Sequence, residues 1–296
     1  MIISASRRTD IPAFYSAWLL QRLRAGFCLV ANPFNPRAVS RVSLAPADVD
    51  VIVFWSKNPA PLMPHLAEIA GLGLRFCFLF TLNDYPGALE PGLAPLDQRI
   101  GVFRDLAGTL GNRRVVWRYD PILLTPEVDA ARHLRSFRRI AAALRGLTPR
   151  VILSVVDPAP QARRRMRALD LSAPGTPGAP EADPAVAALL RDLVAIAADY
   201  GLDIRSCAEP AGLAALGLRP GKCIDEEFIR AAFGIAVPAV KDPGQRRLCG
   251  CIRSRDIGAR NTCIGGCAYC YATDSFPAAE SYHAAHDPAA PGLGPA

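Results

Sequence analysis

The 296 residues are 51% hydrophobic and 21% charged, so the chain can bury a substantial core and wholesale disorder is excluded. No apolar run approaches the roughly 20 residues that span a bilayer, and the opening MIISASRRTD lacks the regions of a signal peptide, so we expect a cytoplasmic protein with no membrane partner. The net charge of +7 fits a solvated basic surface, because no nucleic-acid-binding motif accompanies it.

Short apolar runs alternate with amphipathic stretches along the chain. The runs of strand length are residues 2–6, 49–55, 75–82, 114–120, 151–156 and 203–207. A hairpin-like excursion is expected at 27–44, around NPFNP. Six alternations predict a parallel sheet, in either a partial or full β/α barrel or an open doubly wound arrangement. Neither nucleotide-binding fingerprint is present to favour the open sheet, and we expect the barrel.

Three parts are expected along the chain. Residues 1–235 form the barrel, and residues 236–275 form a cysteine-rich iron–sulfur segment that packs on the barrel mouth. Residues 276–296 are predicted to be a flexible tail, because they resemble in composition the Pro/Gly/Ala-rich loop expected at 170–184.

Polar side chains follow each predicted strand at its carboxyl end, where parallel β/α barrels carry their chemistry. The candidate catalytic residues are Arg8, Lys57, Arg118, Asp120 and Glu209. Arg7 and Asp157 are candidates for cofactor binding. Each has a structural alternative as a cap, a turn residue or an ion-pair partner. Together they predict a charged site for a small anionic or zwitterionic ligand.

Seven of the nine cysteines lie in the last third of the chain, and three of them are closely spaced. Cys263, Cys267 and Cys270 form a C-x3-C-x2-C array. Zinc usually takes four ligands in paired knuckles, and a ferredoxin-type carrier uses four cysteines for each cluster. A [4Fe–4S] cluster on three cysteines leaves one iron open, as a catalytic metal requires.

The other four are Cys207, Cys223, Cys249 and Cys251. They are enough for a complete second centre, because thiolates bind both iron–sulfur clusters and zinc. The sequence leaves open whether this centre is a second [4Fe–4S] cluster or zinc.

The stretch NTCIGGCAYCYA, with Tyr269 before its last cysteine, resembles the signature of radical S-adenosylmethionine (SAM) enzymes. The segments ISASRRTDIP, FWSKNP, WRYDPI and CAE, together with this stretch, resemble the bacterial family called domain of unknown function 1848, whose C-terminal cysteines resemble the radical SAM cluster. The resemblance implies a barrel, a trio-bound [4Fe–4S] cluster whose open iron binds SAM, and Tyr269 near the adenine. The order of parts differs, because the trio here follows the last strand and not the first.

We therefore expect a radical SAM enzyme that cleaves SAM reductively. A small-molecule substrate is favoured over nucleic acid, and a ferredoxin or flavodoxin is the expected electron donor. Two alternatives stay open: a non-catalytic iron–sulfur redox or electron-transfer protein, and a zinc-bound barrel hydrolase.

Overall fold

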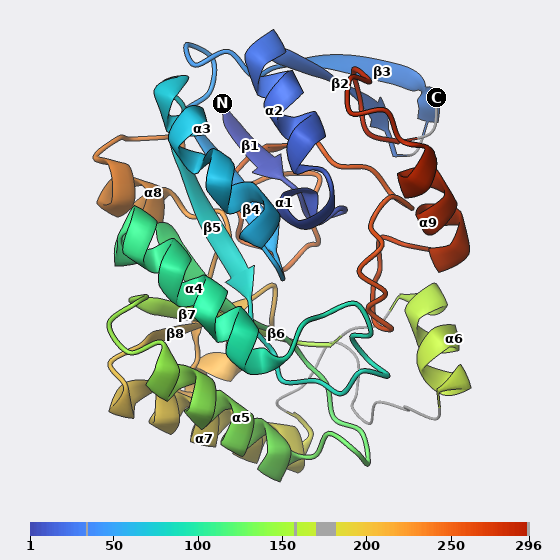
Figure 1. The fold of residues 1–296 in the computed structure, drawn as a ribbon. Helices are drawn as coiled ribbons and strands as arrows, with labels where there is room; N and C mark the ends of the chain where they lie inside the picture. The colour runs from blue at the N-terminus through green and yellow to red at the C-terminus, as the bar shows by residue number, and fades with distance from the viewer. Residues whose placement is uncertain (34, 157–158, 170–181, 295–296) are drawn as a thin grey trace.

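A parallel sheet of eight strands runs through the molecule (Figure 1). The computed structural model describes residues 1–33, 35–156, 159–169 and 182–294. The strand order is β10-β1-β4-β5-β6-β7-β8-β9, and each neighbouring pair is parallel. The strands are β1 (Ile2–Ala5), β4 (Val51–Ser56), β5 (Phe76–Thr81), β6 (Val115–Ile122), β7 (Arg150–Val155), β8 (Asp203–Cys207), β9 (Arg219–Gly221) and β10 (Arg255–Asp256). All six predicted strands are confirmed.

The predicted excursion after the first helices is also confirmed. It is an antiparallel hairpin of β2 (Phe27–Asn32) and β3 (Asn35–Ser43) outside the main sheet. The α-helices are α1 (Ile11–Phe14), α2 (Ser16–Ala25), α3 (Leu66–Gly71), α4 (Leu96–Leu110), α5 (Ala130–Ala143), α6 (Pro160–Ala168), α7 (Pro184–Asp199), α8 (Glu226–Phe233) and α9 (Phe276–Ala285). Short 3-10 turns are η1 (Ala60–His65), η2 (Asn112–Arg114) and η4 (Ala211–Leu216). In the described part of the chain, none of the helices combines the length and the apolar character needed to cross a membrane.

The central strands are buried on both faces because successive side chains point to opposite sides of the sheet. In β4, Ile52 and Phe54 pack into the core beneath the helices, where Trp117 of β6 joins them. Val51 and Val53 face the other way, into a second apolar cluster. This double burial explains why the strands have continuous apolar sequences.

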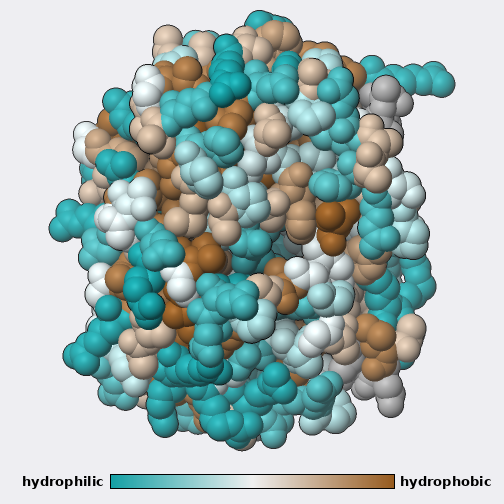
Figure 2. All heavy atoms as spheres, in the orientation of Figure 1, coloured by the Kyte–Doolittle hydropathy of each residue, from teal (hydrophilic) through white to brown (hydrophobic). Residues whose placement is uncertain are grey.

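The two faces of the sheet are covered differently. Apolar side chains of α2, α3, α4, α5 and α7 share one core with the outward side chains of the strands. The opposite face is covered by Phe228 and Ile229 of α8 and by Cys249, Cys251 and Ile252. On the helical side, the exposed Arg135, Arg138 and Arg139 of α5 contribute to a mostly hydrophilic surface (Figure 2).

The sheet is open among the described residues, because β9 and β10 are its two edges and do not pair with each other. The fully closed barrel, one of the expected forms, is therefore not formed. From β1 to β8 the strands follow chain order without the reversal that defines a doubly wound sheet. The architecture is a mixed α/β fold around a large parallel sheet.

The tail predicted for residues 276–296 is corrected by the structure. Ser275 caps α9, and the chain after it runs along α2. Trp18 Nε1 donates to the carbonyl of Ala290 at 2.9 Å, and Leu293 is buried in the main core. The Ala- and Pro-rich composition resembles a linker, but these contacts are tertiary. The loop predicted at 170–184 lies mostly outside the described residues.

Candidate functional site

The C-terminal segment lies beside the first strand, although some 250 residues separate them. β10 pairs with β1 in parallel, with Ser4 opposite Asp256. The Asp256 carboxylate accepts hydrogen bonds from Ser4 Oγ (2.8 Å), Ser6 Oγ (2.7 Å) and the backbone N–H of Arg7 (2.8 Å). A Cβ on Gly258 would lie 2.0 Å from Ser6 Oγ, so only glycine allows this approach. The segment therefore leaves β10 at the carboxyl end of the sheet.

Hydrogen bonds then fix the loop that carries the cysteine trio. Thr9 and Thr262 share a buried hydroxyl–hydroxyl bond of 2.6 Å, and Tyr15 Oη donates to the Thr262 carbonyl at 2.7 Å. The backbone N–H of Ala268 donates to the carbonyl of Leu89 at 2.9 Å. The loops after β1 and β5 thus hold the trio over their ends of the sheet.

Arg165 of α6 fastens the same loop from the opposite side. Its guanidinium donates to the carbonyls of Ala268 (3.1 Å), Cys270 and Thr273 (2.8 Å). In the sequence Arg165 is one of three consecutive arginines, a pattern that does not distinguish it from a solvated basic surface. No local signal links it to the cysteines.

The three thiols of the trio are half-buried, and two of them lie next to Gly265. A Cβ on Gly265 would lie 3.6 Å from Cys263 Sγ and 4.0 Å from Cys267 Sγ, so the missing side chain leaves space between the two sulfurs. The backbone N–H of Ala272 points at Cys270 Sγ at 3.4 Å, a contact typical of cluster thiolates. Burial raises the pKa of Cys263 to about 12, so metal loading must release its proton.

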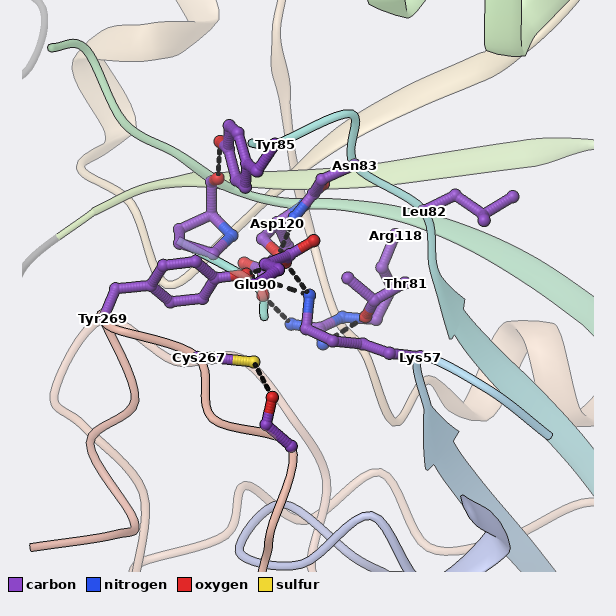
Figure 3. Close-up of polar contacts among 12 residues, drawn as sticks. Lys57, Thr81, Leu82, Asn83, Tyr85, Glu90, Arg118, Asp120, Cys267 and Tyr269 are labelled. Atoms are coloured by element: carbon purple, nitrogen blue, oxygen red, sulfur yellow. Dashed lines mark hydrogen bonds and ion pairs between the residues drawn. The ribbon is translucent and has the colours of Figure 1, made fainter. Parts of the chain in front are cut away.

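Lys57 lies beside the trio in a buried polar group (Figure 3). Its Nζ contacts Glu90 Oε1 at 2.7 Å and Tyr269 Oη at 2.9 Å, and Tyr269 donates to the same Glu90 oxygen. Burial opposes the ionisation of Glu90, but the charge and hydrogen bonds of Lys57 and Tyr269 outweigh it, and the pKa of Glu90 is lowered. The Tyr269 ring packs edge-on against Tyr85 at 6.0 Å. Glu90 escaped the sequence analysis because it follows a Pro/Gly-rich loop and not a strand.

Arg118 and Asp120 form the next group along the carboxyl ends. Arg118 donates to Asp120 Oδ2 at 2.5 Å and to Thr81 Oγ1 at 3.3 Å, and Ser154 donates to Asp120 Oδ1. The amide of Asn83 binds the backbone of Asp120 through both its nitrogen and its oxygen. The candidate residues Arg118 and Asp120 therefore form an ion pair, and hydrogen bonds from two neighbouring strands hold it in place.

The remaining described candidates, Arg7, Arg8 and Glu209, each make contacts of their own. Arg7 stacks on Trp55 and lies close to Cys251, and Arg8 donates to the carbonyl of Gly258. Glu209 accepts from the backbone N–H of Val155 at 2.8 Å. Asp157 lies outside the described residues.

The four earlier cysteines come together in one place. Cys207 ends β8, Cys223 precedes α8, and Cys249 and Cys251 belong to the segment before β10. The sulfurs of Cys207, Cys223 and Cys251 all lie within 4.8 Å of one another, and Cys249 lies in the same buried cluster but outside that group of three. The expectation that the four cysteines form one group is consistent with this geometry.

These features define an α/β protein with an open parallel sheet and a cysteine group able to hold a metal. The family model described as domain of unknown function (DUF1848) matches residues 2–272, so the chain belongs to this family. No curated protein matches the chain. Among solved structures, a short-chain type dehydrogenase/reductase from Mycobacterium marinum aligns at 13% identity, covering 86% of this chain and 92% of that chain with a TM-score of 0.26. That score is too low to support an inference.

Proposed function

We propose that the chain is a radical SAM enzyme whose cluster is held by Cys263, Cys267 and Cys270. The observation that carries the proposal is the position of the three half-buried thiols on one loop over the carboxyl ends of parallel strands, with the sulfurs of Cys263 and Cys267 both next to Gly265. Within the described residues, the sulfurs of Cys207, Cys223 and Cys251 all lie within 4.8 Å of one another, and those of the trio do not. Three thiolates on a [4Fe–4S] cluster leave one iron for a ligand.

The position of β10 supports the same proposal. The resemblance leads us to expect the trio after the first strand of a partial barrel. Here the chain reaches the trio from β10, which lies at the edge of the sheet next to β1 and runs parallel to it. The permuted order therefore still brings the trio to the carboxyl edge of the open parallel sheet, beside its first strand.

When bound, the cluster supplies the electron that cleaves SAM to methionine and a 5′-deoxyadenosyl radical, drawn from a reductant of the ferredoxin or flavodoxin class. The protein contributes charge at the mouth. Glu90 Oε2 is buried without a hydrogen-bond partner among the described residues, and it offers an acceptor to a cationic amino group. Lys57 and Arg118 offer donors to a carboxylate. Both sides of a zwitterion thus have partners, and we assign the SAM amino acid moiety to these residues.

The test is SAM cleavage by the anaerobically reconstituted and reduced protein. We expect 5′-deoxyadenosine in the wild type and none in Cys267→Ala, while Cys28→Ala retains cleavage because Cys28 lies in the main core away from both cysteine groups. Cleavage retained by Cys267→Ala would contradict the assignment of the trio.

Two other outcomes identify the alternatives. Iron and sulfide with an electron paramagnetic resonance signal indifferent to SAM would indicate a redox or electron-transfer protein. Zinc without sulfide at the trio would indicate the barrel hydrolase.

A further inference from the structure

The second cysteine group differs from the trio in its depth. Cys207, Cys223, Cys249 and Cys251 are each at most 7% exposed, and they lie in the apolar cluster on the face of the sheet opposite the main helices. They come from three separate segments of the chain. A single cysteine can be buried without other cysteines beside it. The presence of four thiols at one interior site therefore needs a separate explanation.

The sulfurs of three of these cysteines lie about as close together as the ligands of a single metal ion. Tetrahedral Zn²⁺ with thiolate bonds of about 2.3 Å places its sulfurs about 3.8 Å apart. The sulfurs of Cys207, Cys223 and Cys251 fall within 4.8 Å of one another, and those of Cys207 and Cys223 are 3.1 Å apart without a disulfide. A cubane of irons and sulfides stands between its thiolates and holds them farther apart. These three sulfurs are therefore too close together for a [4Fe–4S] cluster, and Cys249, two residues before Cys251 in the same buried cluster, is the fourth thiol.

The surrounding charges fit an anionic centre. The guanidiniums of Arg7 and Arg118 lie close enough to the group to interact electrostatically, Arg7 with Cys251 and Cys223 and Arg118 with Cys223 and Cys207. Both guanidiniums lie over the ring of Trp55, at 5.0 and 4.9 Å. Asp120 pairs with Arg118 and Asp256 lies near Arg7, and four thiolates around a divalent ion would add a net charge of about −2 beside the same two guanidiniums.

Three hydrogen-bond donors near the cysteines also support a metal centre. Arg7 Nη2 and Arg118 Nε are buried and have no hydrogen-bond partner among the described residues. The backbone N–H of Ile224 lies 3.4 Å from Cys251 Sγ. Metal-bound thiolates accept such hydrogen bonds, which orient the ligands and stabilise their charge.

We propose that Cys207, Cys223, Cys249 and Cys251 bind a single tetrahedral zinc ion, separate from the trio. Zinc is favoured over ferrous iron because a thiolate site of this kind binds Zn²⁺ more tightly and because a closed four-ligand site is the form of structural zinc. The ion joins β8 to the segment that leads into β10. It also holds Arg7 and Arg118 beneath the mouth of the sheet. This inference does not rest on the proposed function.

The experiment measures metals in the chain in which all three trio cysteines are replaced by serine, expressed with both iron and zinc in the medium and purified anaerobically. We expect one zinc per chain, no iron and no sulfide. Zinc-edge X-ray absorption should give a shell of four sulfurs at about 2.3 Å. This measurement needs no change in the four ligands, so it does not depend on whether such variants fold.

A matched pair of variants then locates the ion. On the trio-free background, Cys223→Ser should lower zinc retention at least tenfold against a chelator, and Cys77→Ala, in the same apolar cluster, should leave it unchanged. Iron with sulfide, mononuclear iron, a Cys207–Cys223 disulfide or a metal-free chain would each overturn the proposal. Failure of SAM cleavage in the wild type would leave the zinc result standing, so the two claims fail separately.

Discussion

Arg165 holds the cysteine loop through three of its carbonyl oxygens, although it lies about 100 residues earlier in the chain. Its neighbour Arg164 is exposed. The sequence predicts the cysteine trio from its spacing alone, because the ligands are local. It does not predict the roles of Arg165, Glu90 or Asp256. These residues lie on other elements, so their distance from the cysteines along the sequence follows no recognisable pattern.

Replacing Arg165 by Ala should weaken cluster binding without unfolding the protein. Loss of a residue that orients metal ligands typically costs about 10- to 100-fold in metal affinity. We expect a correspondingly faster loss of iron to a chelator, measured by absorbance, with Arg164→Ala as the control. Equal rates for the two variants would contradict the anchoring role of Arg165.

Gly265→Ala tests the space between the trio's sulfurs. A methyl group at this position makes ordinary contacts with the two sulfurs, so the metal-free fold should accept it. It occupies the space that the cluster requires, and we expect reconstituted iron and sulfide to fall to background. Gly108→Ala, where a Cβ meets nothing within 4 Å, is the control. Normal cluster loading in Gly265→Ala would place the cluster elsewhere.

At the scale of elements, apolar runs predict the six strands because each is buried on both faces. α9 is not predicted, because its Ala- and Pro-rich composition is shared with linkers and its contacts, such as those of His283 with Phe14 and Tyr15, are long-range. The sequence also does not predict the buried contacts of His133 on α5, because they are made to residues outside this helix. This ring lies between Tyr119 Oη at 2.7 Å and the carbonyl of Leu123 at 2.8 Å.

Deleting residues 286–296 tests whether the end of the chain is part of the fold. The deletion exposes Trp18 and removes Leu293 from the core, so we expect the free energy of unfolding to fall by about 2 kcal/mol. Metal content should be unchanged. Chemical denaturation under anaerobic conditions measures the difference. An unchanged free energy of unfolding would support the prediction of a flexible tail.

His133 should make stability depend on pH. Burial lowers its pKa below the ordinary 6.5, so the unfolded chain binds the proton more readily than the native one. Its contribution is therefore present above pH 6.5 and is lost as the pH falls below it. In His133→Gln the free energy of unfolding should fall less steeply from pH 6.5 to about 5 than in the wild type. Parallel curves would show that His133 is not responsible.

At the scale of the whole molecule, the chain joins its end to its beginning. Composition and alternation predict an α/β fold with a parallel sheet, and the sheet is open where a closed barrel was one expectation. The pairing of β10 with β1 depends on two residues per strand and on side chains some 250 positions apart. Such contacts have no signature in local sequence, yet they bring the trio to the mouth of the sheet.

The central claim is that the trio's cluster has an open iron that binds SAM. Electron–nuclear double resonance on the reduced protein, with SAM labelled by heavy nitrogen in its amino group, tests this most directly. We predict a hyperfine coupling from the labelled nitrogen to the cluster, present in the wild type and absent in Cys267→Ala. A reduced cluster that shows no coupling to labelled SAM would contradict the account.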